Sequence, residues 1–461
     1  MLANKVLQDV LTTAGIHAGA DQVRWTGSSL QLPSTYHVGA LASGTVAAQA
    51  VAAAQIWRQR GGAPQQVSVD QRHAQVLFRS ERYLRVNGQP PADLWSPLAG
   101  YYQAGDGRWI QLHTNFEHHR DGVLRVLGCA NDKAAVAAAI ARWRAEELEA
   151  QLAEAGMCAS MIRSPAEWRQ HPQSAALAGL PLLEIERIGD AAPRAMSASP
   201  TRPLSGVRLL DLSRVIAAPV AAKMFAQHGA DVLAVSAAHL PNILPLVMDT
   251  GRGKRSAYLD LRTAEANAVL HQLIAGSDIF LQAYRPGALA GFGLSAEELC
   301  GRYPGLICVS LSAYGHRGPW ATRRGFDSLT QSATGIAYEE GVAAGLSGPG
   351  KLPCQALDHA TGMLAALGAM AALQRRATEG GSWHVRVSLA QTGRYLQQLG
   401  RCGLQDHSAE LSAAEIAACM QKQQGPFGLM SAVAPADTMS VTPPFFAMPS
   451  APPGTHAASW W

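Results

Sequence analysis

The stretch GVRLLDLSRVIAAPVAAKMFAQHGADVLAV, residues 206–235, carries two kinds of hydrophobic pattern in succession. Its first seven residues form a short apolar run of the strand type. Pro219 then stands where a helix can begin, because the first turn of a helix does not need the N–H group that proline lacks. We expect this helix to end near His228 and a second strand to cover residues 231–235. A strand, a helix and a second strand in this order predict two parallel strands.

The same alternation continues along the chain. Helices are predicted at residues 264–275 and 296–302, followed by strands at 279–281 and 306–311. Repeated units of this kind predict a parallel, doubly wound, Rossmann-like α/β sheet within a large domain, residues 204–396. No GxGxxG follows the first strand, so the usual dinucleotide fingerprint is absent.

Three further regions surround this domain. Residues 190–203 are rich in Pro, Ala and Ser and are interpreted as a linker. Residues 96–189 are interpreted as a smaller α+β domain, with two strands around an Asp-Gly turn in 97–112 and a helical stretch at 132–156 that carries Trp143. Residues 397–461 are expected to be helical and then Pro-rich, and the last thirty or so residues to lie extended over another surface.

An internal repeat links the two halves of the chain. Residues 32–84 and 352–396 each contain an Ala-rich helix, a basic last turn, a Gly-Gly stop and an alternating strand. Residues 1–95 are therefore interpreted as a degenerate copy of the later segment. The later copy has Asp358 where the first has Val38, Gly39 or Ala40, depending on the alignment.

Composition excludes several classes of function. The 461 residues carry a formal net charge of +4, and only 16% are charged against about 25% in typical proteins. The basic residues are scattered, which argues against nucleic acid and fits a small polyanionic ligand better. Seven widely spaced cysteines without a CxxC pair indicate reduced thiols and neither a disulfide framework nor a metal site. No signal-peptide core and no run of about 18 apolar residues is found, so we expect a cytoplasmic protein that is not in a membrane.

Several motifs in order resemble the class III CoA-transferases, the CaiB/BaiF family. They are the strand-helix-strand unit at 206–235, Gly253-Lys254-Arg255-Ser256 with Leu259-Asp260-Leu261, Tyr284-Arg285-Pro286-Gly287 with Gly293-Leu294, and SAYGHRGP at 312–319. The first half resembles the family's later part, which implies a rearranged or fused member. The resemblance implies an acyl-CoA transferase with acyl-CoA and carboxylic acid substrates and no further cofactor. It also implies either an interlocked homodimer or an intramolecular version of that architecture.

Asp358 is the residue that the resemblance identifies as catalytic. By itself its position before an apolar helix predicts an N-cap, and a helix dipole is expected to hold such a carboxylate ionised. Matched to the family, this carboxylate attacks the acyl-CoA thioester and forms a mixed anhydride, then an enzyme-bound CoA thioester. The incoming acid repeats these steps in reverse.

A racemase or epimerase of 2-methylacyl-CoA is the alternative inside the family. Those enzymes pair the shared Asp with a His in a Gly-His-Asp motif, which is Gly325-Phe326-Asp327 here. Phe326 cannot move a proton. Phe326 and Asp327 are therefore assigned to substrate binding, although a capping or loop role for Asp327 is an equal interpretation. His359 and His316 match no racemase position and are interpreted as polar surface or loop residues.

The CoA-binding residues implied by the resemblance lie in four loops. They are Val215, Ile216, Gly253, Lys254, Arg255, Tyr284, Arg285 and Arg324. Three positions depart from the family: Ile216 replaces a polar residue of formyl-CoA transferase, Ser236 replaces an acid, and Gly291 replaces an arginine. These departures leave open a third interpretation, a catalytically silent CoA-binding homologue.

Overall fold

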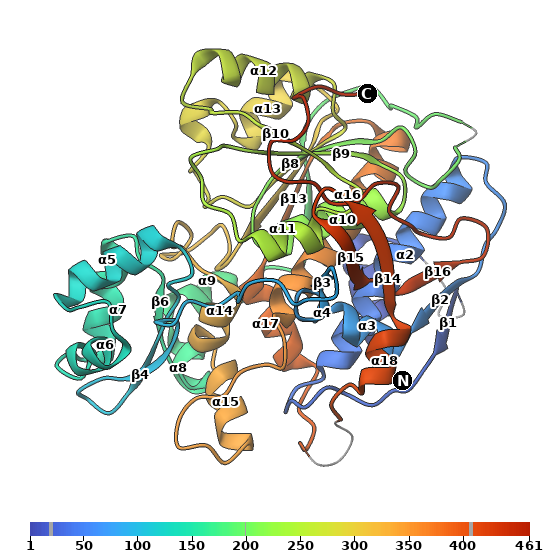
Figure 1. Cartoon of the computed structure of the whole chain (residues 1–461). Coiled ribbons are helices and arrows are strands. Elements are labelled where there is room, and N and C mark those ends of the chain that lie inside the picture. The colour runs from blue at the N-terminus through green and yellow to red at the C-terminus, as the bar shows by residue number, and fades with distance from the viewer. Residues whose placement is uncertain (18–21, 199, 405–408) are drawn as a thin grey trace.

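A seven-stranded sheet forms the centre of the larger half of the protein, seen in a computed structural model that describes residues 1–17, 22–198, 200–404 and 409–461 (Figure 1). The strand order is β10-β9-β8-β11-β12-β13-β7, parallel except for the antiparallel edge strand β7. The strands are β7 (Glu184–Gly189), β8 (Arg208–Leu212), β9 (Asp231–Ser236), β10 (Arg255–Tyr258), β11 (Ile279–Gln282), β12 (Ile307–Ser312) and β13 (Ser382–Ser388). The chain runs outward from β8 to β10 and then returns to β11 on the other side of β8. The order therefore reverses between β8 and β11, which confirms the predicted parallel α/β sheet.

Helices cover both faces of this sheet because its strands are apolar on both sides. Alternate strand residues show this division: Leu209 packs in the cluster with α10 (Ala217–Gln227) and α16 (Ala356–Glu379), and Leu210 in the cluster with α12 (Ala264–Ala275) and α13 (Ala296–Arg302). The bounds of α12 and α13 are those predicted. Helix α10 begins two residues before Pro219.

The internal repeat is present in the structure as two helix-strand-helix units. Helix α2 (Val38–Gln59), strand β2 (Val67–Asp70) and helix α3 (Gln71–Leu77) match α16, β13 and α17 (Leu389–Gln398). Strand β1 (Val23–Thr26) lies parallel to β2 as β12 lies parallel to β13. Helix α2 packs directly against α16, and α1 (Leu2–Ala14) packs against α2. By length and composition α2 and α16 could cross a membrane, but 89% and 100% of their most apolar windows are buried inside the protein.

Each half of the chain completes a sheet of the other half. Strand β7, which precedes the linker, pairs antiparallel with β13. Strand β16 (Asp437–Met439), near the C-terminus, pairs antiparallel with β2. In Figure 1 the red C-terminal segment accordingly lies beside the blue N-terminal elements. One chain therefore contains a reciprocal exchange of edge strands.

The smaller α+β region has its own core and protrudes from the rest of the molecule (Figure 1). The predicted strands around the Asp-Gly turn are the antiparallel pair β4 and β5, to which β6 adds a third strand. The elements are β4 (Gly100–Gln103), β5 (Trp109–Leu112), α5 (Glu117–Leu127), α6 (Lys133–Ile140), α7 (Ala145–Glu154) and β6 (Ala159–Met161). The prediction of one helical stretch across 132–156 was wrong, because the chain turns between α6 and α7 at Trp143.

The C-terminal region departs from its prediction in one respect. After α18 (Ala413–Ala418), strands β14 (Met420–Gly425) and β15 (Gly428–Val433) form a hairpin that the polar sequence MQKQQG did not indicate. Beyond β16 the chain lies extended, as predicted, and Trp460 donates from its indole to the carbonyl of Leu273 at 2.8 Å. Residues 405–408 of this region and residue 199 of the linker lie outside the described residues.

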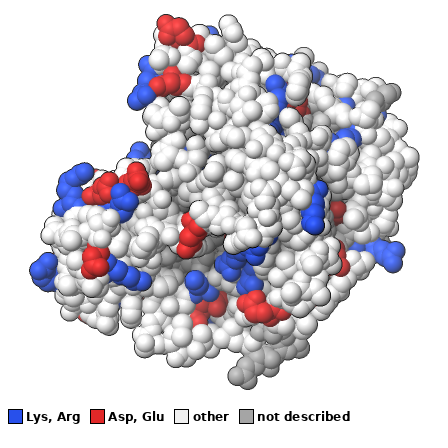
Figure 2. Space-filling model, in the orientation of Figure 1, with Lys and Arg blue, Asp and Glu red and all other residues white. Residues whose placement is uncertain are grey.

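Short elements connect these parts. They are α4 (Ser80–Tyr83), β3 (Arg85–Val86), α8 (Pro165–Gln170), α9 (Pro172–Leu177), α11 (Leu244–Thr250), the 3-10 turn η2 (Ala290–Phe292), α14 (Asp327–Ala333) and α15 (Ile336–Ala343). On the face shown in Figure 2, charged side chains of both signs are scattered among large uncharged areas.

Candidate active site

Asp358 lies in the first turn of α16, but it is not the N-cap that we expected. The helix begins at Ala356 with Gln355 as the N-cap residue, so Asp358 is its third residue. The backbone N–H of Asp358 donates to Oδ2 of Asp327 at 2.9 Å. The Asp327 carboxylate, from a distant segment, therefore binds an N–H group of the first turn that a local N-cap side chain would otherwise bind. The helix can thus begin before Asp358.

The first copy of the repeat shows the same arrangement without the acid. The N-cap residues His37 and Gln355 have nearly the same backbone angles, φ −77° with ψ 55° and φ −77° with ψ 61°. This match aligns Ala40 with Asp358. The N–H of Ala40 is bound by the side-chain oxygen of Gln31 at 3.0 Å, in the place of Asp327. The first copy therefore has a neutral residue at both acidic positions.

Asp358 and Asp327 form a buried pair of carboxyl groups. Asp327 is 1% exposed and Asp358 is 8% exposed. Burial raises the pKa of Asp327 to about 6. Burial also raises the pKa of Asp358 well above its ordinary value, and the charges of Asp327 and Glu81 raise it further. The expectation that the helix dipole holds Asp358 ionised was wrong, because desolvation and like charges outweigh the dipole here.

A cavity of about 400 Å³ extends from Asp358 along the carboxyl ends of β8, β11 and β12. This is the point where the strand order reverses, the usual binding crevice of a doubly wound sheet. The cavity is lined by Val215, Ile216, Tyr284, Arg285, Arg324 and Phe326 among the predicted site residues. The structure therefore brings six of those residues together with the predicted nucleophile.

Three arginines on this cavity have no carboxylate partner among the described residues. Nη1 of Arg214 donates to the carbonyl of Pro241 at 3.0 Å, and Nη1 of Arg285 to that of Thr322 at 3.3 Å. Nη1 of Arg324 lies 3.4 Å from Nε2 of His119, and Nε of Arg324 is buried without a hydrogen-bond partner among the described residues. Burial and neighbouring positive groups lower the pKa of His119 to about 3, so this ring adds no charge. The cavity therefore holds uncompensated positive charge suited to an anionic ligand.

Arg214 is the one of these three that the sequence did not single out. It directly precedes Val215 and Ile216 in the loop after β8, and this position in the sequence could have identified it as a candidate CoA-binding residue.

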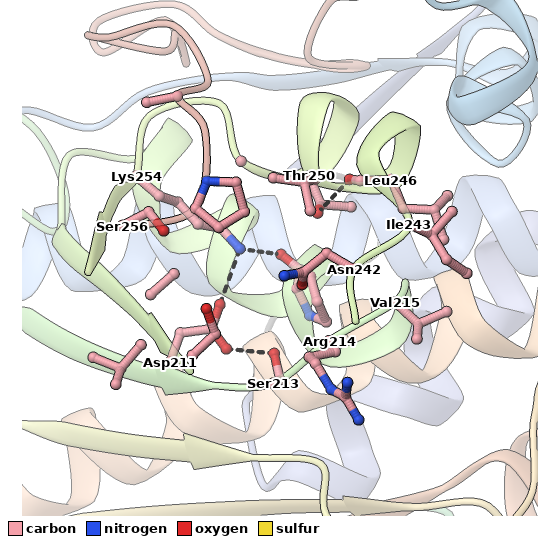
Figure 3. Close-up of a pocket in the computed structure, with 18 of the residues that line it drawn as sticks. Asp211, Ser213, Arg214, Val215, Asn242, Ile243, Leu246, Thr250, Lys254 and Ser256 are labelled. Atoms are coloured by element: carbon pink, nitrogen blue, oxygen red, sulfur yellow. Dashed lines mark hydrogen bonds and ion pairs between the residues drawn. The ribbon is translucent and has the colours of Figure 1, made fainter. Parts of the chain in front are cut away.

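The predicted Gly253-Lys254-Arg255 loop lies apart from this cavity. Lys254 and Arg255 line a neighbouring hollow of about 70 Å³ (Figure 3). Nζ of Lys254 is buried 3.0 Å from Oδ2 of Asp211, and Arg255 pairs with Asp231 at 2.9 Å. Figure 3 shows Arg214 pointing away from Lys254. The charges of Lys254 and Arg255 are thus balanced inside the protein, and a contact of either with CoA stays a prediction.

The loop before α10 has an unusual backbone. Val215 has φ +73°, a conformation that is strained for a β-branched residue and that occurs mainly at functional sites. Ile216 is the N-cap residue of α10, and the N–H groups of Ile216 and Ala217 have no protein acceptor among the described residues. Both residues line the cavity beside Asp358. Free N–H groups at the positive end of a helix can stabilise developing negative charge there.

A second, smaller cavity of about 60 Å³ meets the first at Asp358. Its lining joins residues from both halves of the chain: Glu81, Arg82, Leu94, Trp95, His113, Asn115, Val215, Ile216, Ile243, Leu246, Phe326, Asp327, Ser328, Gln355 and Asp358. The residues from the first half carried no functional signal in the sequence. Only the tertiary contacts bring them to Asp358.

Glu81 and His359 form a buried contact next to this cavity. Oε2 of Glu81 lies 3.2 Å from Nε2 of His359, and the imidazole stacks on Phe78. His359 is 2% exposed, so its interpretation as a surface or loop residue was wrong. His316 is partly buried, 3.5 Å from Glu184.

Comparison with known proteins shows the family. The model of CoA-transferase family III matches residues 24–190 and 204–403, on both sides of the linker. An acyl-CoA transferase of Gibberella moniliformis is 31% identical over 366 residues, 70% of this chain and 64% of that protein. The β subunit of a succinyl-CoA–L-malate CoA-transferase of Chloroflexus aurantiacus is 33% identical over 42% of this chain and 50% of its own. The chain thus spans from half to two thirds of the length of these relatives.

Among solved structures, a hypothetical protein of Mycobacterium tuberculosis is 32% identical, with a TM-score of 0.39 over 43% of this chain and 59% of its own. A CaiB/BaiF family protein of Brucella suis is 25% identical, with a TM-score of 0.37 over 50% of this chain and 65% of its own. The match of the family model to both halves of the sequence shows that the chain belongs to CoA-transferase family III.

Proposed function

We propose that the protein transfers CoA from an acyl-CoA to a carboxylic acid, with Asp358 as the nucleophile. One observation carries this proposal. A buried carboxylate stands at the junction of two cavities, and the larger cavity holds three arginines that have no carboxylate partner in the part of the chain that the structure describes. A CoA thioester has the matching form, with a polyanionic nucleotide at one end and a neutral acyl group at the other.

The arginine-lined cavity receives the CoA part of the substrate. Guanidinium groups of Arg214, Arg285 and Arg324 bind phosphate oxygens through charged hydrogen bonds. The pantetheine arm then leads the thioester between Ile216 and Phe326 toward Asp358, because all three residues line both cavities. Asp327, Phe326 and the backbone at Val215 and Ile216 position the reacting group.

The reaction consists of exchanges between carboxylates and thiolates. The Asp358 carboxylate attacks the thioester carbonyl; a C–O bond forms, the C–S bond breaks and the electron pair leaves with sulfur as the CoA thiolate. The thiolate attacks the aspartyl carbonyl of the anhydride and releases the donor acid. CoA is then bound to Asp358 as a thioester. The acceptor acid repeats these two steps in reverse. No net proton transfer is needed.

The charge distribution of the site favours the first step. The attack removes a negative charge from a place where Asp327 and Glu81 repel it and transfers that charge to sulfur, on the arginine side. The free N–H groups of Ile216 and Ala217 are placed to donate to the tetrahedral oxyanion. The raised pKa of Asp358 makes its ionised form a stronger nucleophile, at the cost of a smaller ionised fraction.

One chain supplies both walls of this site. Glu81, Trp95 and His113 come from the first half, and Ile216 and Asp358 from the second. Together with the exchange of β7 and β16, this supports an intramolecular version of the interlocked architecture, in place of the homodimer that was the other expectation.

Trapping the covalent intermediate tests the proposal. The protein is mixed with a panel of acyl-CoAs, quenched with hydroxylamine or borohydride, and digested for mass spectrometry. We expect a modified peptide that contains Asp358 and no modification in Asp358→Asn. Glu146→Gln is the matched control, because Glu146 is an exposed acid in the first turn of another helix, α7.

Two results would contradict the mechanism. Modification of a different peptide would exclude Asp358 as the nucleophile. CoA binding that is equal in the wild type and in Asp358→Asn, without modification by any thioester, would show a silent CoA-binding homologue instead.

A further inference from the structure

We infer that the smaller cavity beside Asp358 is the acyl pocket and that it accepts only short acyl groups, with about six or fewer non-hydrogen atoms beyond the thioester carbonyl. This inference rests on the proposed function. It adds the class of substrate and the residues that set it.

The position of the cavity assigns its occupant. It meets the arginine-lined cavity at Asp358, with Val215, Ile216 and Phe326 shared between the two. When the CoA part fills the larger cavity and the thioester carbon stands at Asp358, the acyl chain must continue on the other side. The smaller cavity is the space on that side.

The volume of the cavity limits the chain. It measures about 60 Å³. One water-sized group needs about 10–15 Å³ of cavity volume, so the cavity holds about four to six groups of the size of a water molecule or a methylene group. A propionyl to hexanoyl group fits this space, whereas a dodecanoyl chain exceeds it about twofold.

Aromatic stacking makes one wall of the pocket rigid. The ring centroids of His113 and Phe326 are 3.8 Å apart, with an angle of 6° between the ring planes. Trp95 packs edge-on against His113, with ring centroids 6.2 Å apart. His113 is 5% exposed, and burial lowers its pKa to about 4, so the ring is neutral at physiological pH. A longer chain that displaced His113 would have to break this stack.

Another part of the lining is apolar and comes from the second half of the chain. Ile243 precedes α11 and Leu246 belongs to its first turn, and Leu246 is 5% exposed. Ile216 completes the wall from the start of α10. These aliphatic side chains suit the methylene groups of a short acyl chain.

A chain-length series tests the inference. We would measure kcat/KM for straight-chain acyl-CoAs from acetyl to palmitoyl with one fixed acceptor acid, and the extent of trapping at Asp358 for each. We expect a maximum between propionyl and hexanoyl and values at least tenfold lower for dodecanoyl and palmitoyl.

Two enlarging variants identify the walls. His113→Ala removes the stacked ring, and Leu246→Ala removes an aliphatic side chain without affecting the stack. Each is expected to move the optimum toward longer chains. His271→Ala, on α12 at the opposite face of the sheet, is the control that should leave the profile unchanged.

The outcomes separate this inference from the proposed function. Trapping at Asp358 that is as efficient with palmitoyl-CoA as with butyryl-CoA would overturn the short pocket and leave the nucleophile in place. An optimum that stays fixed in both folded enlarging variants would likewise overturn it. Absence of trapping with every acyl-CoA would refute the proposed function itself.

Discussion

Replacement of Asp327 by Asn tests how the two buried carboxyl groups influence each other. Asn keeps an oxygen that can accept the N–H of Asp358, which now binds Oδ2 of Asp327 at 2.9 Å, but it removes the negative charge. At an effective dielectric constant of about 20, two unit charges repel by about 4 kcal/mol at about 4 Å and by about 3 kcal/mol at about 6 Å, or roughly two to three pKa units. Asp327 itself is ionised only above about pH 6, so part of this repulsion is felt in the titration of Asp358.

The expected result is a shift of the acid limb of kcat/KM. In the proposed mechanism the ionised form of Asp358 is the nucleophile, so activity is expected to rise with pH as Asp358 loses its proton. In Asp327→Asn the pKa of Asp358 falls, and we expect the limb to move by one to two pH units toward acid. The assay is a profile of kcat/KM from pH 4.5 to 9 with one acyl-CoA and one acceptor.

A comparison variant separates charge from geometry. Asp327→Ala removes the charge and also the acceptor for the N–H of Asp358, so we expect it to lower activity at every pH. An acid limb that does not move in a folded Asp327→Asn protein would refute the reasoning. It would show that the charge of Asp327 does not govern the ionisation of Asp358.

Three other predictions concern stability, CoA binding and stoichiometry. Burial raises the pKa of Asp358 in the folded state, so its ionisation destabilises the fold progressively as pH rises above the unfolded-state pKa of about 4. Asp358→Asn should therefore raise Tm at pH 8 and not at pH 4. A Tm at pH 8 equal to that of the wild type would contradict this. Arg324→Ala should weaken acyl-CoA binding roughly 10- to 100-fold, the value of one hydrogen bond to a charged group, whereas the exposed Arg125→Ala should leave it unchanged in the same titration. Quantitative trapping should give one modified aspartate per chain, at Asp358, and no modification of the peptide that contains Ala40; two modified positions per chain would refute the assignment of a single site.

The sequence by itself determined the parts whose signals are local. Hydrophobic patterns along the chain placed α12 and α13 at their observed bounds and indicated the parallel sheet, because each such signal lies within a few residues. The repeat and the family motifs identified Asp358 and the loops with Val215, Tyr284 and Arg285. They gave no sign of the β14–β15 hairpin, whose polar strands are held by pairing with distant β3.

The tertiary structure decided which charges remain available and which residues meet. Lys254 and Arg285 look alike as single basic residues in motif loops, yet Lys254 is paired with Asp211 while Arg285 has no carboxylate partner among the described residues. Likewise, His113 reaches the active site only because the first half of the chain folds against the second. Desolvation and charge pairing depend on groups far apart in sequence, so the raised pKa of Asp358 and the walls around it appear only in the fold.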